Sequence, residues 1–204
     1  IFGFSIFGKE YTYLLDKNNK INYHILNEFL KKFHKKKFFV FGFTSFIYEN
    51  LIMKINSKKL NYKMNNALLL HGGGWKKMEE KKISNKNFKE KLFKKFKIKN
   101  VQNYYGLVEQ TGSIFVECQK CNSFVTSVYS DVLIRDNNFK VLKNGLKGLI
   151  QLFSLVPTSY PGHSIITEDI GAIIDKKNNC TINAKHFVVY GRSKKSEIRG
   201  CSDA

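Results

Sequence analysis

The segment NYYGLVEQ, at residues 103–110, combines an aromatic ring, a glycine and a carboxylate at a spacing that suits nucleotide chemistry. Tyr105 could stack on a purine base, and Gly106 would let the backbone approach a phosphate without an intervening side chain. Glu109 could ligate Mg²⁺, a hard cation that prefers carboxylate and phosphate oxygens. The segment therefore indicates a site for a magnesium-bound nucleotide, although the match is weak when it is taken alone.

Three further segments follow a fixed order around it: LHGGG at residues 70–74, ITEDIG at 166–171, and YGR at 190–192 followed by EIRG at 197–200. Asp169 could accept hydrogen bonds from ribose hydroxyls, and Arg192 could donate to ribose or phosphate oxygens. Each segment also has an ordinary structural explanation, because a glycine triplet is usually a turn and Tyr104 and Tyr105 could be core aromatics. The fixed order of four modest signals is what favours nucleotide binding.

The elements that would position these residues begin as alternating strands and helices. Short apolar runs predict three strands, at residues 37–43, 67–71 and 101–104. Helices are expected between them, at residues 45–54 with Thr44 as the cap, from 75–80, and at 85–97 with a cap near Ser84 or Asn85. This alternation implies a parallel sheet with right-handed crossovers, in which ligands gather beyond the carboxyl ends of the strands.

Beyond Gln110 the pattern changes to short strands separated by turn residues. They are expected at residues 113–117, 124–129, 132–135, 148–154, 171–174 and 186–189. The predicted fold class is therefore α/β: a parallel α/β subdomain followed by an antiparallel β subdomain resembling a distorted barrel. The boundary is expected near residue 113, which divides residues 1–112 from 113–204.

Bulk composition excludes several classes of protein. The net charge is +19, but 32 of the 35 basic residues are lysines, and the chain is rich in Asn, Ile and Phe. An AT-rich genome explains this better than a nucleic-acid partner, since nucleic-acid surfaces favour arginine.

No apolar run approaches the ~20 residues of a membrane span. Four cysteines without a secretory signal indicate the cytoplasm. Because the first methionine is Met53, we expect the C-terminal part of a longer protein.

The pair Cys118 and Cys121 has half of a zinc-site spacing. Cys180, His163 or His186 could complete a site in three dimensions, but no second pair follows at a suitable distance in the sequence. A hairpin turn that carries two incidental thiols is the favoured interpretation.

Together the segments resemble the adenylate-forming superfamily and, within it, most closely the LuxE-type acyl-protein synthetases. The resemblance covers nearly the whole chain and rests on FGFTSFIYEN at residues 41–50, HGGGWKK at 71–77, YGLVEQTGS at 105–113 and EIRGCS at 197–202. It implies that the fold is part of the N-terminal domain of such an enzyme. It also implies an ATP-dependent ligase that makes an acyl-adenylate from a fatty acid, with release of pyrophosphate.

The resemblance also implies roles for particular residues. Tyr105, followed by Gly106, would stack on the adenine, and Glu109 would hold Mg²⁺. Gly73 and Gly74 would border the adenine, and Asp169 and Arg192 would bind the ribose. Cys201 stands where LuxE-type enzymes carry the cysteine that accepts the acyl group as a thioester and supplies a fatty-acyl reductase. Residues 1–112 would then be the nucleotide-binding subdomain, incomplete at its N-terminus, and 113–204 a β-rich subdomain with a C-terminal acyl-acceptor tail.

The sequence departs from the family pattern in several places. No Ser/Thr/Gly-rich phosphate loop occurs before residue 100, which predicts that this chain alone does not handle pyrophosphate. Val108 replaces the usual threonine that bonds the α-phosphate, and Ser193 replaces the usual aspartate after Gly–Arg. The mobile C-terminal domain of the superfamily has no counterpart among these 204 residues, which is what the resemblance to LuxE-type proteins leads us to expect.

Two alternatives stay open. A phenylacetate-type acyl-CoA ligase would transfer the acyl group to CoA rather than to Cys201. A non-catalytic fragment, either basic and anion-binding or decayed, would show no stabilisation by ATP and salt-sensitive binding to polyanions. The sequence leaves open the acyl chain length, the oligomeric state, and whether the chain folds or acts alone.

Overall fold

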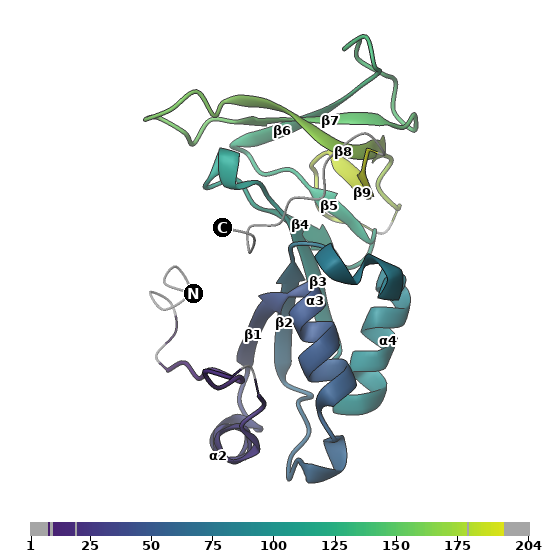
Figure 1. The fold of residues 1–204 in the computed structure, drawn as a ribbon. Coiled ribbons are helices and arrows are strands. Elements are labelled where there is room, and N and C mark those ends of the chain that lie inside the picture. Colours follow the sequence, from purple (N-terminus) through teal and green to yellow (C-terminus); the bar gives the residue numbers. More distant parts are fainter. Residues whose placement is uncertain (1–7, 9, 19, 179, 194–204) are drawn as a thin grey trace. The chain divides into compact units, whose positions relative to one another are not determined.

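The computed structural model describes residues 8, 10–18, 20–178 and 180–193 (Figure 1). The chain divides into two compact units, Ile1–Val101 and Gln102–Ala204. This division falls earlier in the chain than the predicted functional boundary at 112/113, which stays a prediction. Within the described residues, no helix has the length and apolar character needed to cross a membrane.

The first unit is built on two parallel strands, which correspond to two of the three strands that the sequence predicts for a parallel sheet. The third, predicted over 101–104, is strand β3 (Asn100–Tyr105), which crosses the division between the units. Strands β1 (Phe38–Phe43) and β2 (Ala67–Gly72) pair in register from Phe38 opposite Ala67 to Phe43 opposite Gly72. The other elements are α2 (Tyr23–Phe33), α3 (Thr44–Phe46), η1 (Ile47–Lys54), η2 (Ser57–Lys59), η3 (Lys76–Lys81) and α4 (Asn85–Phe96). Figure 1 shows η1, which continues α3, running beside α4, and these two helices contact each other.

Helix α4 shows why this unit has a core despite its many lysines. Phe88, Leu92 and Phe96 recur at a helical period and are fully buried. Ser84 caps the helix as predicted, because its side chain accepts a hydrogen bond from the Asn87 amide at 3.2 Å. Phe93, the remaining phenylalanine of this helix, is exposed, and the Lys97 ammonium lies over its ring.

The predicted cap at Thr44 is wrong. Thr44 is the first residue of α3, and its hydroxyl instead bonds Nδ1 of His71 at 2.9 Å and the Gly72 carbonyl at 3.0 Å. The expected single helix over 45–54 is a short α-helical turn followed by a π-helical stretch, and the region after Trp75 is 3₁₀-helical. The local sequence pattern predicted a capping role for Thr44, but its hydroxyl bonds two residues of β2 instead.

The second unit is an antiparallel sheet. Its strands are arranged in the order β3-β4-β5-β9-β8-β7-β6. Their bounds are β3 Asn100–Tyr105, β4 Phe115–Cys118, β5 Ser123–Val125, β6 Ser130–Arg135, β7 Gly148–Ser154, β8 Ser164–Ile174 and β9 His186–Arg192. The antiparallel prediction is confirmed, but the expected barrel is not closed, because within the described strands the order ends at β6 without returning to β3.

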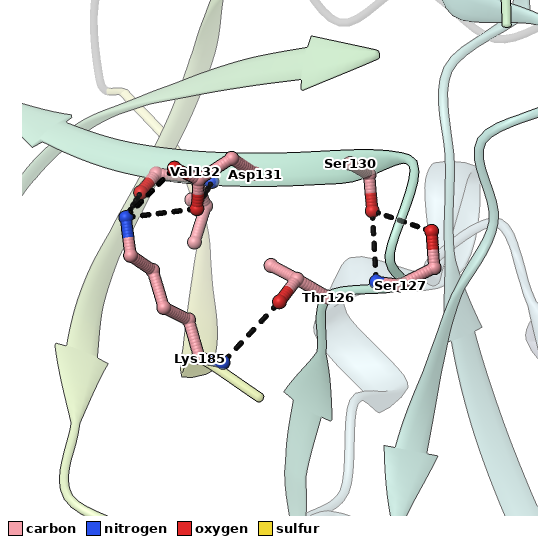
Figure 2. A network of polar contacts seen from close by, with 6 residues as sticks. All are labelled: Thr126, Ser127, Ser130, Asp131, Val132 and Lys185. Atoms are coloured by element: carbon pink, nitrogen blue, oxygen red, sulfur yellow. Dashed lines mark hydrogen bonds and ion pairs between the residues drawn. The ribbon is translucent and has the colours of Figure 1, made fainter. Parts of the chain in front are cut away.

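The sequence misplaced the end of one strand in this unit. A strand was expected over 124–129, but β5 ends at Val125 and the chain turns. Figure 2 shows the turn: the Ser127 amide donates to the Ser130 hydroxyl at 2.9 Å, and the Lys185 amide donates to the Thr126 hydroxyl at 3.2 Å. The Lys185 ammonium also pairs with Asp131 at 2.8 Å. Local side-chain bonds to backbone groups therefore ended the strand.

Candidate nucleotide site

The hydroxyl of Tyr105, at the end of β3, donates a 2.6 Å hydrogen bond to Oδ2 of Asp169 on β8. Burial, followed by the charge of the Asp169 carboxylate and this hydrogen bond, raises the pKa of Tyr105 above its ordinary value of 10.0. The phenol therefore stays protonated at neutral pH and remains a donor to the carboxylate. The contact orients Asp169 before any ligand is present.

Asp169 lies directly opposite Arg192 in the pairing of β8 with β9. Residues opposite each other in an antiparallel pair project from the same face of the sheet. The Arg192 charge also acts to lower the pKa of Tyr105, which fits its nearness to the pair. A phenol, a carboxylate and a guanidinium, all selected from the sequence, are thus brought together within the second unit.

Two glycines, Gly171 and Gly191, allow β8 and β9 to pair closely near Asp169 and Arg192. A Cβ on Gly171 would lie 2.5 Å from the Val188 carbonyl oxygen, so a side chain there would force β8 and β9 apart. Gly191 has a φ of 137°, a conformation that L side chains rarely adopt. The register shifts between Ile170 and Gly171, and this bulge directs the ends of both strands.

The segment after Tyr105 is held as a compact loop. Gln110 is buried, and its amide donates to the Gly162 carbonyl at 2.8 Å. The Thr111 amide donates to the Tyr160 hydroxyl at 2.9 Å, and Ser113 bonds Ser154. A side chain on Gly106 would crowd the Ser113 carbonyl oxygen at 3.2 Å, which accounts for the glycine.

The ends of this loop are fixed, while its predicted metal ligand faces solvent. Glu109 is exposed in the single turn η4 (Val108–Gln110), and so is Val108, at the position where the family has a threonine. A carboxylate on a fixed turn can supply an oxygen to Mg²⁺. Val108 has no hydroxyl to offer a phosphate.

The predicted adenine border lies in the first unit, directly after β2. Gly73 and Gly74 have φ values of 76° and 66°, in the left-handed region that favours glycine. A Cβ on Gly73 would also lie 2.8 Å from the Phe43 ring. The backbone conformation therefore favours glycine at both positions, and the absence of side chains there would allow a planar base to approach the backbone.

His71, just before these glycines, is a buried neutral base that sequence reasoning gave no role. Because a carbonyl can only accept, the Thr44 hydroxyl donates to Gly72, and Nδ1–H of His71 must then donate to Thr44. Nε2 is left as a buried acceptor without a partner within the described residues. Burial and, to a smaller extent, the Lys89 charge lower the pKa of His71 from 6.5 to about 3.

This histidine predicts a loss of stability in acid. The unfolded chain takes up the proton near pH 6.5 but the folded chain only near pH 3, so between these values the unfolded state binds more protons. The free energy of unfolding should therefore fall with decreasing pH by up to about 1.4 kcal/mol per pH unit. Urea unfolding across this range should show the slope, and His71→Gln should lack that component. Equal slopes in both proteins would contradict the assignment.

Four aromatic residues in β1 and the helical segment after it, which could line an apolar tunnel for an acyl chain, do not form one group. Tyr48 is buried, with its ring 4.9 Å from the Trp75 ring, and so belongs to the core of the first unit. Phe39, Phe43 and Phe46 are exposed at about two fifths of their surface or more. Of these four residues only the exposed three could contact an acyl chain.

The sequence-predicted residues thus fall into three sets. In the second unit Tyr105 contacts Asp169, which is paired opposite Arg192. Gly106 and Glu109 belong to the loop that follows Tyr105, and Gly73 and Gly74 belong to the first unit. Cys201 lies outside the described residues. Sequence reasoning missed Gln110 and Tyr160, which fix the loop. Gln110 carried a signal, since it adjoins Glu109 in the motif.

Solved structures with a similar fold are adenylate-forming enzymes. An open conformation of 2-hydroxyisobutyryl-CoA ligase, in complex with 2-HIB-AMP and CoA, matches with a TM-score of 0.65 and 16% identity, over 82% of this chain and 36% of that one. The amide bond synthetase McbA from Marinactinospora thermotolerans matches with a TM-score of 0.56 and 13% identity, over 85% and 35%. The luciferase-like enzyme from the nonluminescent mealworm Zophobas morio matches with a TM-score of 0.55 and 19% identity, over 87% and 42%.

These likenesses show the fold, and the chain spans less than half of the length of each neighbour. No curated protein matches the chain significantly. The family of acyl-protein synthetases, LuxE, matches over residues 5–204, which is nearly the entire sequence. The chain therefore belongs to the LuxE acyl-protein synthetase family.

Proposed function

We propose that the protein activates a fatty acid with ATP as an acyl-adenylate and transfers the acyl group to Cys201 as a thioester, for delivery to a fatty-acyl reductase. Family membership supports an acyl-adenylate-forming ligase. The observation that carries the proposal is the contact of Tyr105 with Asp169, directly across from Arg192.

This cluster fits a nucleotide. Tyr105 occupies Oδ2 of Asp169, while Oδ1 accepts no hydrogen bond from the described residues. An ionised carboxylate with a vacant oxygen is a strong acceptor for the hydroxyls of a ribose. Arg192 adds a fixed positive charge on the same face of the sheet, which suits ribose or phosphate oxygens.

Glu109 is the residue that would hold Mg²⁺, the ion that would offset the negative charge of the triphosphate. Its carboxylate is exposed and stands on a turn whose neighbour Gln110 is anchored in the interior. An oxygen ligand on a rigid support agrees with the preference of this cation.

The proposed reaction has two balanced steps. A fatty carboxylate oxygen attacks the α-phosphorus of ATP, and pyrophosphate leaves with the electrons of the broken bond. The Cys201 thiolate then attacks the acyl carbonyl carbon of the mixed anhydride, and AMP leaves. The second step suits sulfur, because a thiolate attacks an anhydride well and the resulting thioester stays reactive for reduction.

Intact-protein mass spectrometry tests the proposal. This chain, and the protein translated from the complete reading frame, would be incubated with ATP, Mg²⁺ and myristic acid. A hydroxylamine-sensitive gain of one acyl group that depends on ATP is the expected result. A gain in the longer protein alone would place the phosphate-binding function in the additional sequence.

Adding CoA to the same reactions separates the alternatives. Acyl-CoA without acyl-protein would favour a CoA ligase instead. If neither product forms and ATP does not raise the melting temperature of either protein, the chain does not activate fatty acids and the proposal fails.

A further inference from the structure

Three of the cysteines gather in the second unit, although they come from separate parts of the sequence. Cys118 ends β4, Cys121 lies in the turn before β5, and Cys180 lies in the segment before β9. Their exposed fractions are only 6%, 7% and 7%. The three Sγ atoms all lie within 4.8 Å of one another, and those of Cys118 and Cys180 are 3.6 Å apart.

This spacing suits a shared metal ion. A tetrahedral zinc ion with bonds of about 2.3 Å to sulfur places two ligand sulfurs about 3.8 Å apart. A disulfide requires about 2.05 Å, so the three thiols are free as they stand. Thiols this close and this buried would otherwise form only a small apolar cluster, in which Val125 is the hydrophobic side chain packed against them.

A fourth potential ligand lies beside Cys180, although it is not in the group of three whose ligand atoms are all within 4.8 Å of one another. His186, at the start of β9, is 1% exposed, and its Nε2 lies 3.9 Å from Sγ of Cys180. Its Nδ1 bonds the Ser123 hydroxyl at 2.8 Å. A histidine ligand commonly has its other ring nitrogen held by such an outer partner, which fixes the ring and leaves one nitrogen for the metal.

The backbone around the cluster is preorganised. Asn122 takes a left-handed φ of 52°, and its amide donates to the Cys118 carbonyl at 2.7 Å, which closes the turn around Cys121. Cys118 pairs with Ser123 in the β4–β5 hairpin. Lys185, next to His186, is fixed by its bonds to Thr126 and Asp131 (Figure 2). The ligands therefore stand on elements that are already hydrogen-bonded.

We propose that Cys118, Cys121, Cys180 and His186 bind a structural Zn²⁺ ion. Soft thiolates with one imidazole favour zinc over the hard cations Mg²⁺ and Ca²⁺. Four protein ligands leave no open position, so the ion holds structure rather than substrate. It ties the β4–β5 hairpin to the start of β9, whose far end carries Arg192, while β4 pairs with β3, which carries Tyr105.

Metal analysis of the full chain, purified under reduction and without chelator, tests this. About one zinc per chain is expected by elemental mass spectrometry. Cys118→Ser and Cys180→Ser should lose it, while Cys201→Ser, which removes the fourth cysteine of the chain, should keep it. His186→Ala should retain the thiolates but weaken zinc affinity at least about tenfold. Because the serine variants could fail to fold, Co²⁺ is also titrated into reduced, metal-free wild-type protein, where thiolate-to-cobalt absorption is expected.

Several results would overturn the proposal. The first is reduced wild-type protein that contains no zinc and shows no thiolate-to-cobalt absorption. The second is a Cys118–Cys180 disulfide found by peptide mapping in protein never exposed to reductant, together with the absence of metal. Unchanged zinc affinity in His186→Ala would remove His186 from the ligand set and refute the closed site.

Discussion

Cys201→Ser is expected to abolish the acyl-protein product while leaving formation of the acyl-adenylate intact. A serine hydroxyl is not ionised at neutral pH and attacks the anhydride poorly without a base, whereas a thiolate needs none. Acyl mass gain should therefore fall to background. Exchange of pyrophosphate into ATP, which depends on the fatty acid and reports the first step, should stay within about twofold, because the acceptor takes part only in the second step.

The matched control for this variant is Ser202→Ala, which changes the adjacent residue and keeps the thiol. It should be acylated like the wild-type protein. An acyl mass gain that survives in Cys201→Ser and resists hydroxylamine would mean that another group accepts the acyl chain. Loss of both pyrophosphate exchange and acylation would mean that the substitution disturbs the nucleotide site instead.

Asp169→Asn is expected to reduce kcat/KM for ATP in adenylate formation about 100-fold. The change keeps the shape of the side chain but removes the charge that strengthens its hydrogen bonds to hydroxyl donors. Hydrogen bonds to charged groups contribute about 1.5–3 kcal/mol each, so the loss of one or two accounts for this factor. The fold should survive, since the asparagine oxygen can still accept from Tyr105. Steady-state pyrophosphate exchange at varied ATP measures the effect.

Two further variants make this result specific. Tyr105→Phe keeps the ring and removes only the hydroxyl that orients Asp169, so a smaller loss of about tenfold is expected, corresponding to one hydrogen bond. Glu168→Gln removes the neighbouring exposed carboxylate, which lies 4.0 Å from Arg192, and should have little effect. An equal loss of kcat/KM in Asp169→Asn and Glu168→Gln would mean that Asp169 contributes only negative charge to the region and makes no specific hydrogen bond to ATP.

Much of the fold could be predicted because its signals are local. The apolar run of β1, the amphipathic stripe of α4 and the Ser84 cap each depend on residues within a few positions of one another. The prediction for Thr44 failed because its hydroxyl bonds His71 and Gly72 on a neighbouring strand. The strand expected to continue past Val125 ended because serine side chains in the following turn captured backbone groups.

The same division holds for the candidate sites. By itself the sequence determined the family, the α/β class, and the residue types suited to nucleotide chemistry, because fixed spacings within short segments carry that information. Only the tertiary structure decided that Asp169 receives the Tyr105 hydroxyl and stands opposite Arg192. It also brought Cys180 to within 3.6 Å of Cys118, where the sequence favoured two incidental thiols. The physical reason is register: pairing between distant strands sets which side chains meet, and no local pattern encodes it.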